Sequence, residues 1–173
     1  MDNQIVKRTV IYEGLFVLEH YNDIENGGFD GTRIKTEPFR YSSLNNPICY
    51  PHVTVAYKPE VTHEELYGTE ISIIVKGYGN DGINEGYLVE FVPYFATTKG
   101  DKFSKLCELL SNIEIPHITI SISDEGKPVN TSKLKFEKLP MDKQFVLDGE
   151  FGAFVEEEYS DGTKVTDFYG LRH

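Results

Sequence analysis

Two short segments of this chain repeat one pattern, and that pattern restricts how each of them can fold. Residues 51–55 read Pro-His-Val-Thr-Val, and residues 116–120 read Pro-His-Ile-Thr-Ile. β-Branched residues favour extended backbone, and side chains in a strand alternate between its two faces. The histidine and the threonine of each segment therefore share one face, and the aliphatic residues share the other. The sequence predicts two strands that each carry an imidazole and a hydroxyl on the polar side.

The rest of the chain predicts mostly strands. The residue pattern indicates further strands at residues 8–18, 69–78, 87–92, 134–139 and 145–155. Residues 164–169 are expected to form a last strand or a tail. Residues 101–113 have apolar side chains at helical spacing and predict the one clear helix. We therefore expect a single α+β domain over residues 1–173 that is strand-rich with few helices.

A long polar stretch at residues 21–50 connects the first predicted strand to the first histidine strand. It contains the turn signals Asn26-Gly27-Gly28 and Asn45-Asn46-Pro47. Loops of this length inside a compact domain are usually functional. Because this stretch leads directly to His52, we expect it to form a lid over a site.

Charge and composition narrow the classes of partner. The formal net charge is −11, whereas proteins that track a nucleic-acid backbone are usually basic. We therefore expect no long nucleic acid as a partner, and a small phosphate ligand fits better. The chain has no apolar run of membrane-spanning length and no signal-peptide pattern at its start, so we expect no membrane association and a cytoplasmic location. Cys49 and Cys107 fit no metal or redox spacing and are expected to be reduced thiols.

The paired histidines suggest acid–base chemistry on a phosphate. Cleavage of a phosphodiester needs a base for the attacking oxygen and an acid for the leaving oxygen, and His52 and His117 can fill both roles near neutral pH. Thr54 and Thr119 share their faces and can donate to a non-bridging phosphate oxygen. Such a site needs no metal and no cofactor. We therefore predict these four residues to be catalytic, and the sequence does not say which histidine is the base.

Three other interpretations compete with this one. The repeat can be a coincidence in a β-rich domain. A zinc site at His52 and His117 would need three or four ligands, and the sequence does not complete that set. A nucleophilic pair of Cys49 with His52 has no evident orienting residue. The other histidines have no motif context and are expected to be incidental surface residues: His20, His63 and His173.

Paired His-x-Thr-apolar motifs, one in each half of a chain of this length, resemble the signature of the 2H phosphoesterase superfamily. The resemblance implies a two-lobed, pseudo-symmetric fold, with a first half at about residues 1–95 and a second at about 96–173. It implies a cleft where the motif strands meet, and metal-independent phosphodiesterase activity. The catalytic residues of the family correspond to His52, Thr54, His117 and Thr119.

Within that superfamily the chain is similar to phage anti-CBASS phosphodiesterases, which destroy cyclic oligonucleotide signals such as cGAMP. The similarity rests on the compact length, on the opening strand around Tyr12 and on the two motif contexts. It implies that Tyr12 faces the cleft and that an acidic residue late in the chain, here Glu150, contacts a base. Because the chain has no Trp, base stacking falls to a tyrosine such as Tyr57, and Lys58 is a candidate source of positive charge.

The sequence leads to one preferred function and two alternatives. The preferred function is a viral enzyme that hydrolyses cyclic di- or oligonucleotides in the host cytoplasm and so antagonises immune signalling. The first alternative is a 2′,3′-cyclic phosphodiesterase of RNA-end processing. The second is a protein that sequesters nucleotides without turnover. The oligomeric state cannot be predicted.

Overall fold

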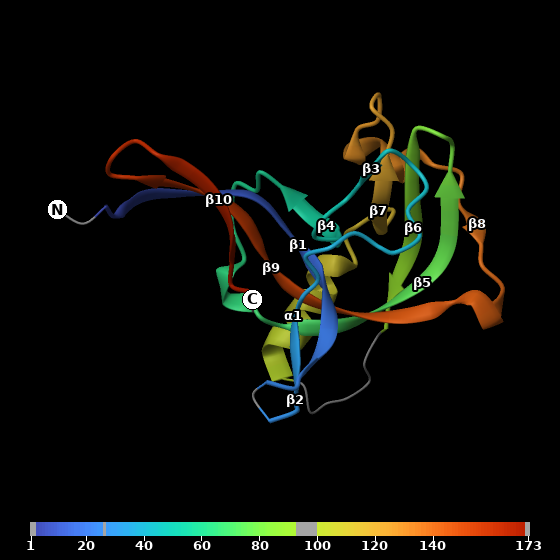
Figure 1. Ribbon diagram of the computed structural model, residues 1–173, viewed down its shortest axis with the longest axis horizontal. Helices are drawn as coiled ribbons and strands as arrows, with labels where there is room; N and C mark the ends of the chain where they lie inside the picture. The colour runs from blue at the N-terminus through green and yellow to red at the C-terminus, as the bar shows by residue number, and fades with distance from the viewer. Residues whose placement is uncertain (1–2, 26, 93–99, 172–173) are drawn as a thin grey trace.

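The computed structural model describes residues 3–25, 27–92 and 100–171 (Figure 1). Within these residues, ten strands form one antiparallel sheet. The strands are β1 Ile5–Asp23, β2 Phe29–Ile34, β3 Asn46–Pro47, β4 His52–Tyr57, β5 Glu70–Asn80, β6 Asn84–Phe91, β7 His117–Ile122, β8 Glu137–Lys138, β9 Phe145–Tyr159 and β10 Lys164–Tyr169. The helices are α1 Gly100–Leu110 and the short 3-10 turns η1 Glu64–Leu66, η2 Pro128–Lys133 and η3 Met141–Lys143. The predicted strand-rich α+β class is confirmed.

The sheet has the order β10-β9-β1-β4-β7-β6-β5-β8, with β2 attached to β1 and β3 attached to β7. Strand β9 is long enough to pair with β1 along most of its length and with β5 near its start. The pairings through β9, β1, β4, β7, β6 and β5 therefore form a closed circuit, and the sheet curves back on itself (Figure 1). The two histidine strands, β4 and β7, are neighbours within this circuit.

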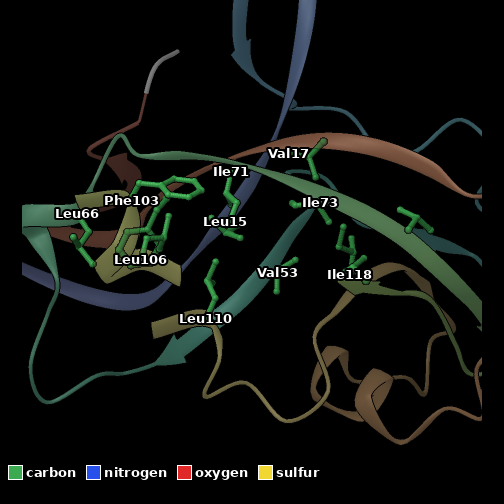
Figure 2. Packing of buried hydrophobic residues seen from close by; sticks show 13 residues of the cluster. Leu15, Val17, Val53, Leu66, Ile71, Ile73, Phe103, Leu106, Leu110 and Ile118 are labelled. Carbon is green, nitrogen blue, oxygen red and sulfur yellow. The ribbon is translucent and has the colours of Figure 1, made fainter. Parts of the chain in front are cut away.

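The main core lies between one face of the sheet and the helices α1 and η1. Figure 2 shows side chains from β1, β4, β5 and β7 meeting side chains from α1. The helix contributes Phe103, Leu106 and Leu110, all buried. Its apolar face follows the predicted spacing, although the α-helix ends at Leu110 and not at residue 113. A second buried cluster around Phe16, on the opposite face of β1, packs against Phe168 of β10.

The prediction of one long loop at residues 21–50 is wrong. Strand β1 continues to Asp23, and β2 returns alongside it in antiparallel register with Leu18 opposite Ile34. The following residues are also tied down, because β3 pairs with β7 and the amide of Ile48 donates to the carbonyl of Ile120 (2.9 Å). This part of the chain is therefore a hairpin followed by a segment fixed along the sheet.

Two strand predictions differ from the structure in extent. The predicted strand at residues 134–139 is reduced to β8, because Leu134 caps the turn η2 and is buried against the sheet. Strand β6 begins at Asn84, before the predicted start at residue 87, because the preceding turn is closed by Asp81, whose carboxylate accepts from the amide of Asn84 (2.7 Å). Within the described residues, no helix has the length and apolar character needed to cross a membrane.

Candidate functional site

Strands β4 and β7 bring the two repeated motifs side by side. Val53 and Ile118, which stand between the histidine and the threonine of each motif, are opposite each other in antiparallel register. Both side chains are buried in the core, at 1% and 0% exposed. By the same register, the histidine of each strand lies opposite the threonine of the other strand, on the face away from the core. The four predicted catalytic residues therefore meet on one face: His52, Thr54, His117 and Thr119.

A proline begins each motif without breaking the sheet. The carbonyl of Pro51 accepts from the amide of Val17 (3.0 Å), and the carbonyl of Pro116 accepts from the amide of Val89 (3.1 Å). Each proline thus uses its only backbone hydrogen-bonding group on the neighbouring strand. This explains how a residue without an N–H can stand directly before each histidine.

The two imidazoles are held in the same way. Nδ1 of His52 lies 2.9 Å from the carbonyl oxygen of Tyr50, and Nδ1 of His117 lies 2.8 Å from that of Ile115. A carbonyl oxygen can only accept, so Nδ1 of each ring is the donor. Each neutral ring then keeps its lone pair on Nε2. The geometry leaves both Nε2 atoms able to take or give a proton.

The surroundings of His52 favour its neutral form. Burial lowers the pKa of His52, the hydrogen bond to the Tyr50 carbonyl opposes this shift, and the charge of the nearby His117 lowers it again. Two imidazolium ions on neighbouring strands would repel each other. His52 is therefore the member of the pair that its surroundings keep neutral.

An aromatic wall supports His52 from β1. The ring of Tyr12 stacks on the imidazole with centroids 4.5 Å apart, and the ring of Phe16 lies 5.5 Å away. Burial raises the pKa of Tyr12, so the phenol stays neutral. Gly14 lies between them on β1, where a Cβ atom would come within 2.7 Å of the carbonyl oxygen of Val53. Glycine thus allows β1 to approach β4 closely beneath the site.

The two threonines have different environments. Thr54 is exposed, and its hydroxyl has no hydrogen-bond partner within the described part of the chain. The hydroxyl of Thr119 lies 2.8 Å from that of Thr131 in η2. Thr131 is completely buried and also accepts from Nδ2 of Asn84 (3.0 Å). Only Thr119 is therefore connected to the interior.

The predicted substrate-binding residues are spread over a wider area. Tyr12 lies in the site, stacked on His52 as described above. Glu150 of β9 is opposite Phe16 of β1, so it lies in the same row across the sheet as His52, but it is only 2% exposed. Tyr57 is 67% exposed at the end of β4, where the ammonium of Lys58 lies 5.6 Å from the centre of its ring. Tyr12 thus directly contacts a predicted catalytic residue.

His63 is not the incidental residue that the sequence suggested. The buried carboxylate of Glu13 accepts from the backbone N–H of His63 (2.7 Å), from its Nδ1 (2.8 Å) and from the hydroxyl of Tyr67 (2.8 Å). Burial and the Glu13 carboxylate raise the pKa of Tyr67. A lone glutamate in an apolar strand signals that such partners must exist, but the sequence does not identify them. His20 bonds to Asp148 at the surface, and His173 lies outside the described residues.

A second buried carboxylate fixes the segment that was predicted to be a lid. Glu85 of β6 accepts from the backbone and the hydroxyl of Ser43, from Ser121 (2.7 Å) and from Tyr78. Burial acts to raise the pKa of Glu85, but these hydrogen bonds outweigh it and lower the pKa below its ordinary value. The carboxylate is therefore ionised at neutral pH and holds this segment against β6 and β7.

Two cavities flank the sheet. A cavity of about 330 Å³ adjoins Tyr50, the residue whose carbonyl holds His52. Its lining residues are Arg33, Ile34, Thr36, Tyr50, Asp167 and Phe168. A larger cavity of about 610 Å³ lies between β5, β6 and the end of α1. The larger cavity is lined mainly by apolar side chains and includes Pro116, the residue before His117, so each cavity adjoins one of the two histidine strands.

The competing site chemistries find little support within residues 3–25, 27–92 and 100–171. No three histidine, cysteine, aspartate or glutamate side chains there are grouped to hold a metal ion. Cys49 is exposed, and no hydrogen bond joins it to His52 in this part of the chain. Comparison with known proteins gives no further guide: no protein-family model, curated protein or solved structure matches the chain.

Proposed function

We propose that this chain is a metal-independent phosphodiesterase of the 2H type that cleaves cyclic di- or oligonucleotides. The observation that carries the proposal is the matched pair of imidazoles on β4 and β7, each with Nδ1 bound to the carbonyl two residues earlier. Two rings held alike with free Nε2 atoms suit a base and an acid acting on one phosphate. The proposal includes pseudo-symmetric halves at about residues 1–95 and 96–173, which the repeated strands and hydrogen bonds support.

The proposed reaction uses His52 as the base. The lowered pKa of His52 keeps Nε2 unprotonated near neutral pH, so it can take the proton of the attacking hydroxyl, from water or from a ribose 2′-OH. As the new P–O bond forms, protonated His117 gives its Nε2 proton to the leaving oxygen and the old P–O bond breaks. Each of these two roles contributes on the order of 10² to 10⁴ in rate.

The threonines would stabilise charge on the phosphate. Thr54 and Thr119 flank the two imidazoles on the same face, and their hydroxyls can donate to non-bridging oxygens. The net charge of −11 disfavours a polymeric substrate and leaves a small cyclic nucleotide as the better fit. Cleavage of such signals in a host cytoplasm would make this chain a viral antagonist of immune signalling.

The proposal assigns substrate contacts around the four catalytic residues. Tyr12 supports His52 and forms one wall of the site. Exposed Tyr57, with Lys58 over its ring, would offer a stacking surface and positive charge to a more distant nucleotide. Glu150, buried in the same row of the sheet, would contact a base edge only where the substrate reaches past Phe16.

The test is a chromatographic assay in the presence of EDTA. Wild-type protein is incubated with cyclic dinucleotides, cyclic trinucleotides and 2′,3′-cyclic mononucleotides. The comparison variants are His52→Ala, His117→Ala and the double variant. His20→Ala is the matched control, because His20 is an exposed histidine of β1 that bonds only to Asp148 and Thr32 among the described residues.

We expect wild type and His20→Ala to cleave the larger rings, and each motif variant to lose at least 10²-fold in rate. Turnover of 2′,3′-cyclic mononucleotides alone would instead indicate RNA-end processing. Binding without turnover in the wild type would indicate a sequestering protein. Turnover that survives in the double variant would refute the two-histidine mechanism.

A further inference from the structure

A buried chain of polar groups leads from the candidate site into the turn η2. The hydroxyl of Thr119 lies 2.8 Å from that of Thr131, and Thr131 Oγ1 lies 3.0 Å from Nδ2 of Asn84. Nδ2 of Asn84 also donates to the carbonyl of Lys127 (2.8 Å). Thr131 and Asn84 are 0% and 1% exposed. Neither residue belongs to the repeated motifs. Among the described residues, Thr54 of β4 has no corresponding hydrogen-bonded partners.

The Lys127 carbonyl determines which group donates and which accepts in each of these hydrogen bonds. A carbonyl can only accept, so the amide group of Asn84, and not its oxygen, must face Lys127. The second amide hydrogen then points to Thr131, which must accept it. The hydroxyl proton of Thr131 is left with one acceptor within the described residues, the oxygen of Thr119.

The opposite direction would leave a buried donor unsatisfied. If Thr119 donated to Thr131, the hydroxyl proton of Thr131 would have no acceptor among the described residues, although Thr131 is completely buried. Such orphaned groups are rare because each costs a full desolvation penalty. With Thr131 as the donor, the hydroxyl proton of Thr119 is not used between the two threonines and can turn toward the site. Its other neighbour, the Pro128 carbonyl, is 3.4 Å away and gives at most a weak bond.

Close packing of Thr131 on β6 holds the turn η2 in place against the sheet. Thr131 lies directly over Gly86 of β6, where a Cβ atom would be 2.4 Å from Cγ2 of Thr131 and 2.9 Å from the carbonyl oxygen of Ile118. Gly86 is in turn opposite Thr119 in the register of β6 and β7. The close approach that glycine permits therefore brings η2 onto the sheet at the position of Thr119.

We propose that Asn84 and Thr131 are positioning residues that fix the Thr119 hydroxyl as a proton donor toward the substrate phosphate. This inference rests on the proposed function, because it assigns the donor for a phosphate held between the two imidazoles. Thr54 has no such support, so the two threonines are unequal. Thr119 is preset as a donor, whereas Thr54 must orient when the substrate binds.

The activity test separates the hydroxyl of Thr131 from its shape. Thr131→Val keeps the shape and removes the hydroxyl, whereas Thr131→Ser keeps the hydroxyl and removes the methyl group above Gly86. Removal of a complete oxyanion donor costs about 10² to 10³ in kcat, and a donor that is only misdirected costs less. We expect Thr131→Val to lower kcat about 10- to 100-fold with little change in KM, and Thr131→Ser to keep most of the activity.

The controls distinguish positioning from stability. Thr166→Val makes the same change at an exposed threonine of β10 and should leave kcat unchanged. Melting temperatures of all variants are measured in parallel. If Thr131→Ser loses as much kcat as Thr131→Val, or if kcat follows the melting temperature across the series, the role of Thr131 is structural and the inference is wrong.

A second measurement does not depend on turnover or on variants that fold. NMR of wild-type protein labelled with ¹³C-threonine should show an exchange-protected hydroxyl proton coupled to the carbons of Thr131. A protected proton coupled to Thr119 instead would overturn the inference and leave the proposed function standing. If the Thr131 proton is observed but no nucleotide is cleaved, the proposed function fails and the positioning role fails with it.

Discussion

Replacing Gly14 with alanine should disturb the candidate site from beneath. Gly14 is opposite Thr54 in the register of β1 and β4, and an added Cβ atom would lie 2.7 Å from the carbonyl oxygen of Val53. Ordinary van der Waals contact begins at 3.4 Å, so β1 and β4 must separate by about 0.7 Å. The obstructing atom belongs to the backbone, so no side chain can rotate to relieve the contact.

The size of the effect follows from that displacement. Overpacking of a tight contact costs about 1–3 kcal/mol, which for a chain of this length lowers the melting temperature by about 2–12 °C. Val53 also pairs with Ile118 of β7, so its movement shifts His52 relative to His117. Misplacement of a catalytic group by about 1 Å can cost 10² in rate. We therefore expect Gly14→Ala to lose about 10-fold or more in kcat while it still folds.

The assay compares kcat and melting temperature with those of Gly82→Ala. Gly82 lies in the turn between β5 and β6, has φ of +83°, and has open space where a Cβ atom would be. An alanine in this left-handed conformation costs about 1–2 kcal/mol without moving β4. Gly82→Ala should lose stability and keep kcat. If Gly14→Ala keeps wild-type kcat, or if the two variants lose kcat in proportion to stability, the argument from the close approach of β1 and β4 is wrong.

Three further predictions concern the buried charges and the imidazole. His63→Ala removes one charged hydrogen bond from the buried carboxylate of Glu13 and should lower the free energy of unfolding in urea by about 2 kcal/mol; a loss below 0.5 kcal/mol would contradict this. Ser43→Ala weakens the attachment to Glu85, so amides of residues 42–48 should exchange faster with deuterium, and unchanged exchange would refute the anchoring role. The folded state lowers the pKa of His52 from 6.5, so the neutral ring stabilises the fold above pH 6.5 and this stabilisation is lost as the pH falls. The melting temperature of wild type should therefore drop more between pH 7 and pH 5 than that of His52→Gln, and equal drops would contradict this.

Local sequence was sufficient to predict the strands that carry the site. A proline followed by alternating β-branched residues specifies an extended segment with one buried face, and β4 and β7 have this form. The edge strand β10 covers residues 164–169, for which the sequence left a strand or a tail open. In these segments local propensity and burial favour the same conformation, so each strand could be predicted from its own residues.

The long-range pairings could not be predicted in the same way. The polar composition of residues 21–50 indicated a loop, yet part of it forms β2, because β1 extends beyond its apolar run and offers a backbone edge. Backbone pairing of this kind does not depend on side-chain polarity. The anchoring of Ser43 by Glu85, 42 residues later in the chain, likewise has no local signal.

The candidate site shows how local and long-range features combine. Each histidine is oriented by the carbonyl two residues before it, so its ring geometry is contained in its own short segment. What distinguishes the two halves comes from elsewhere: the Tyr12 ring and the close approach at Gly14 act on His52, whereas Asn84 and Thr131 act on Thr119. A repeated segment can supply two similar catalytic groups, but a phosphodiesterase needs one base and one acid. The unequal surroundings, and not the repeat itself, are what would give the two histidines different roles.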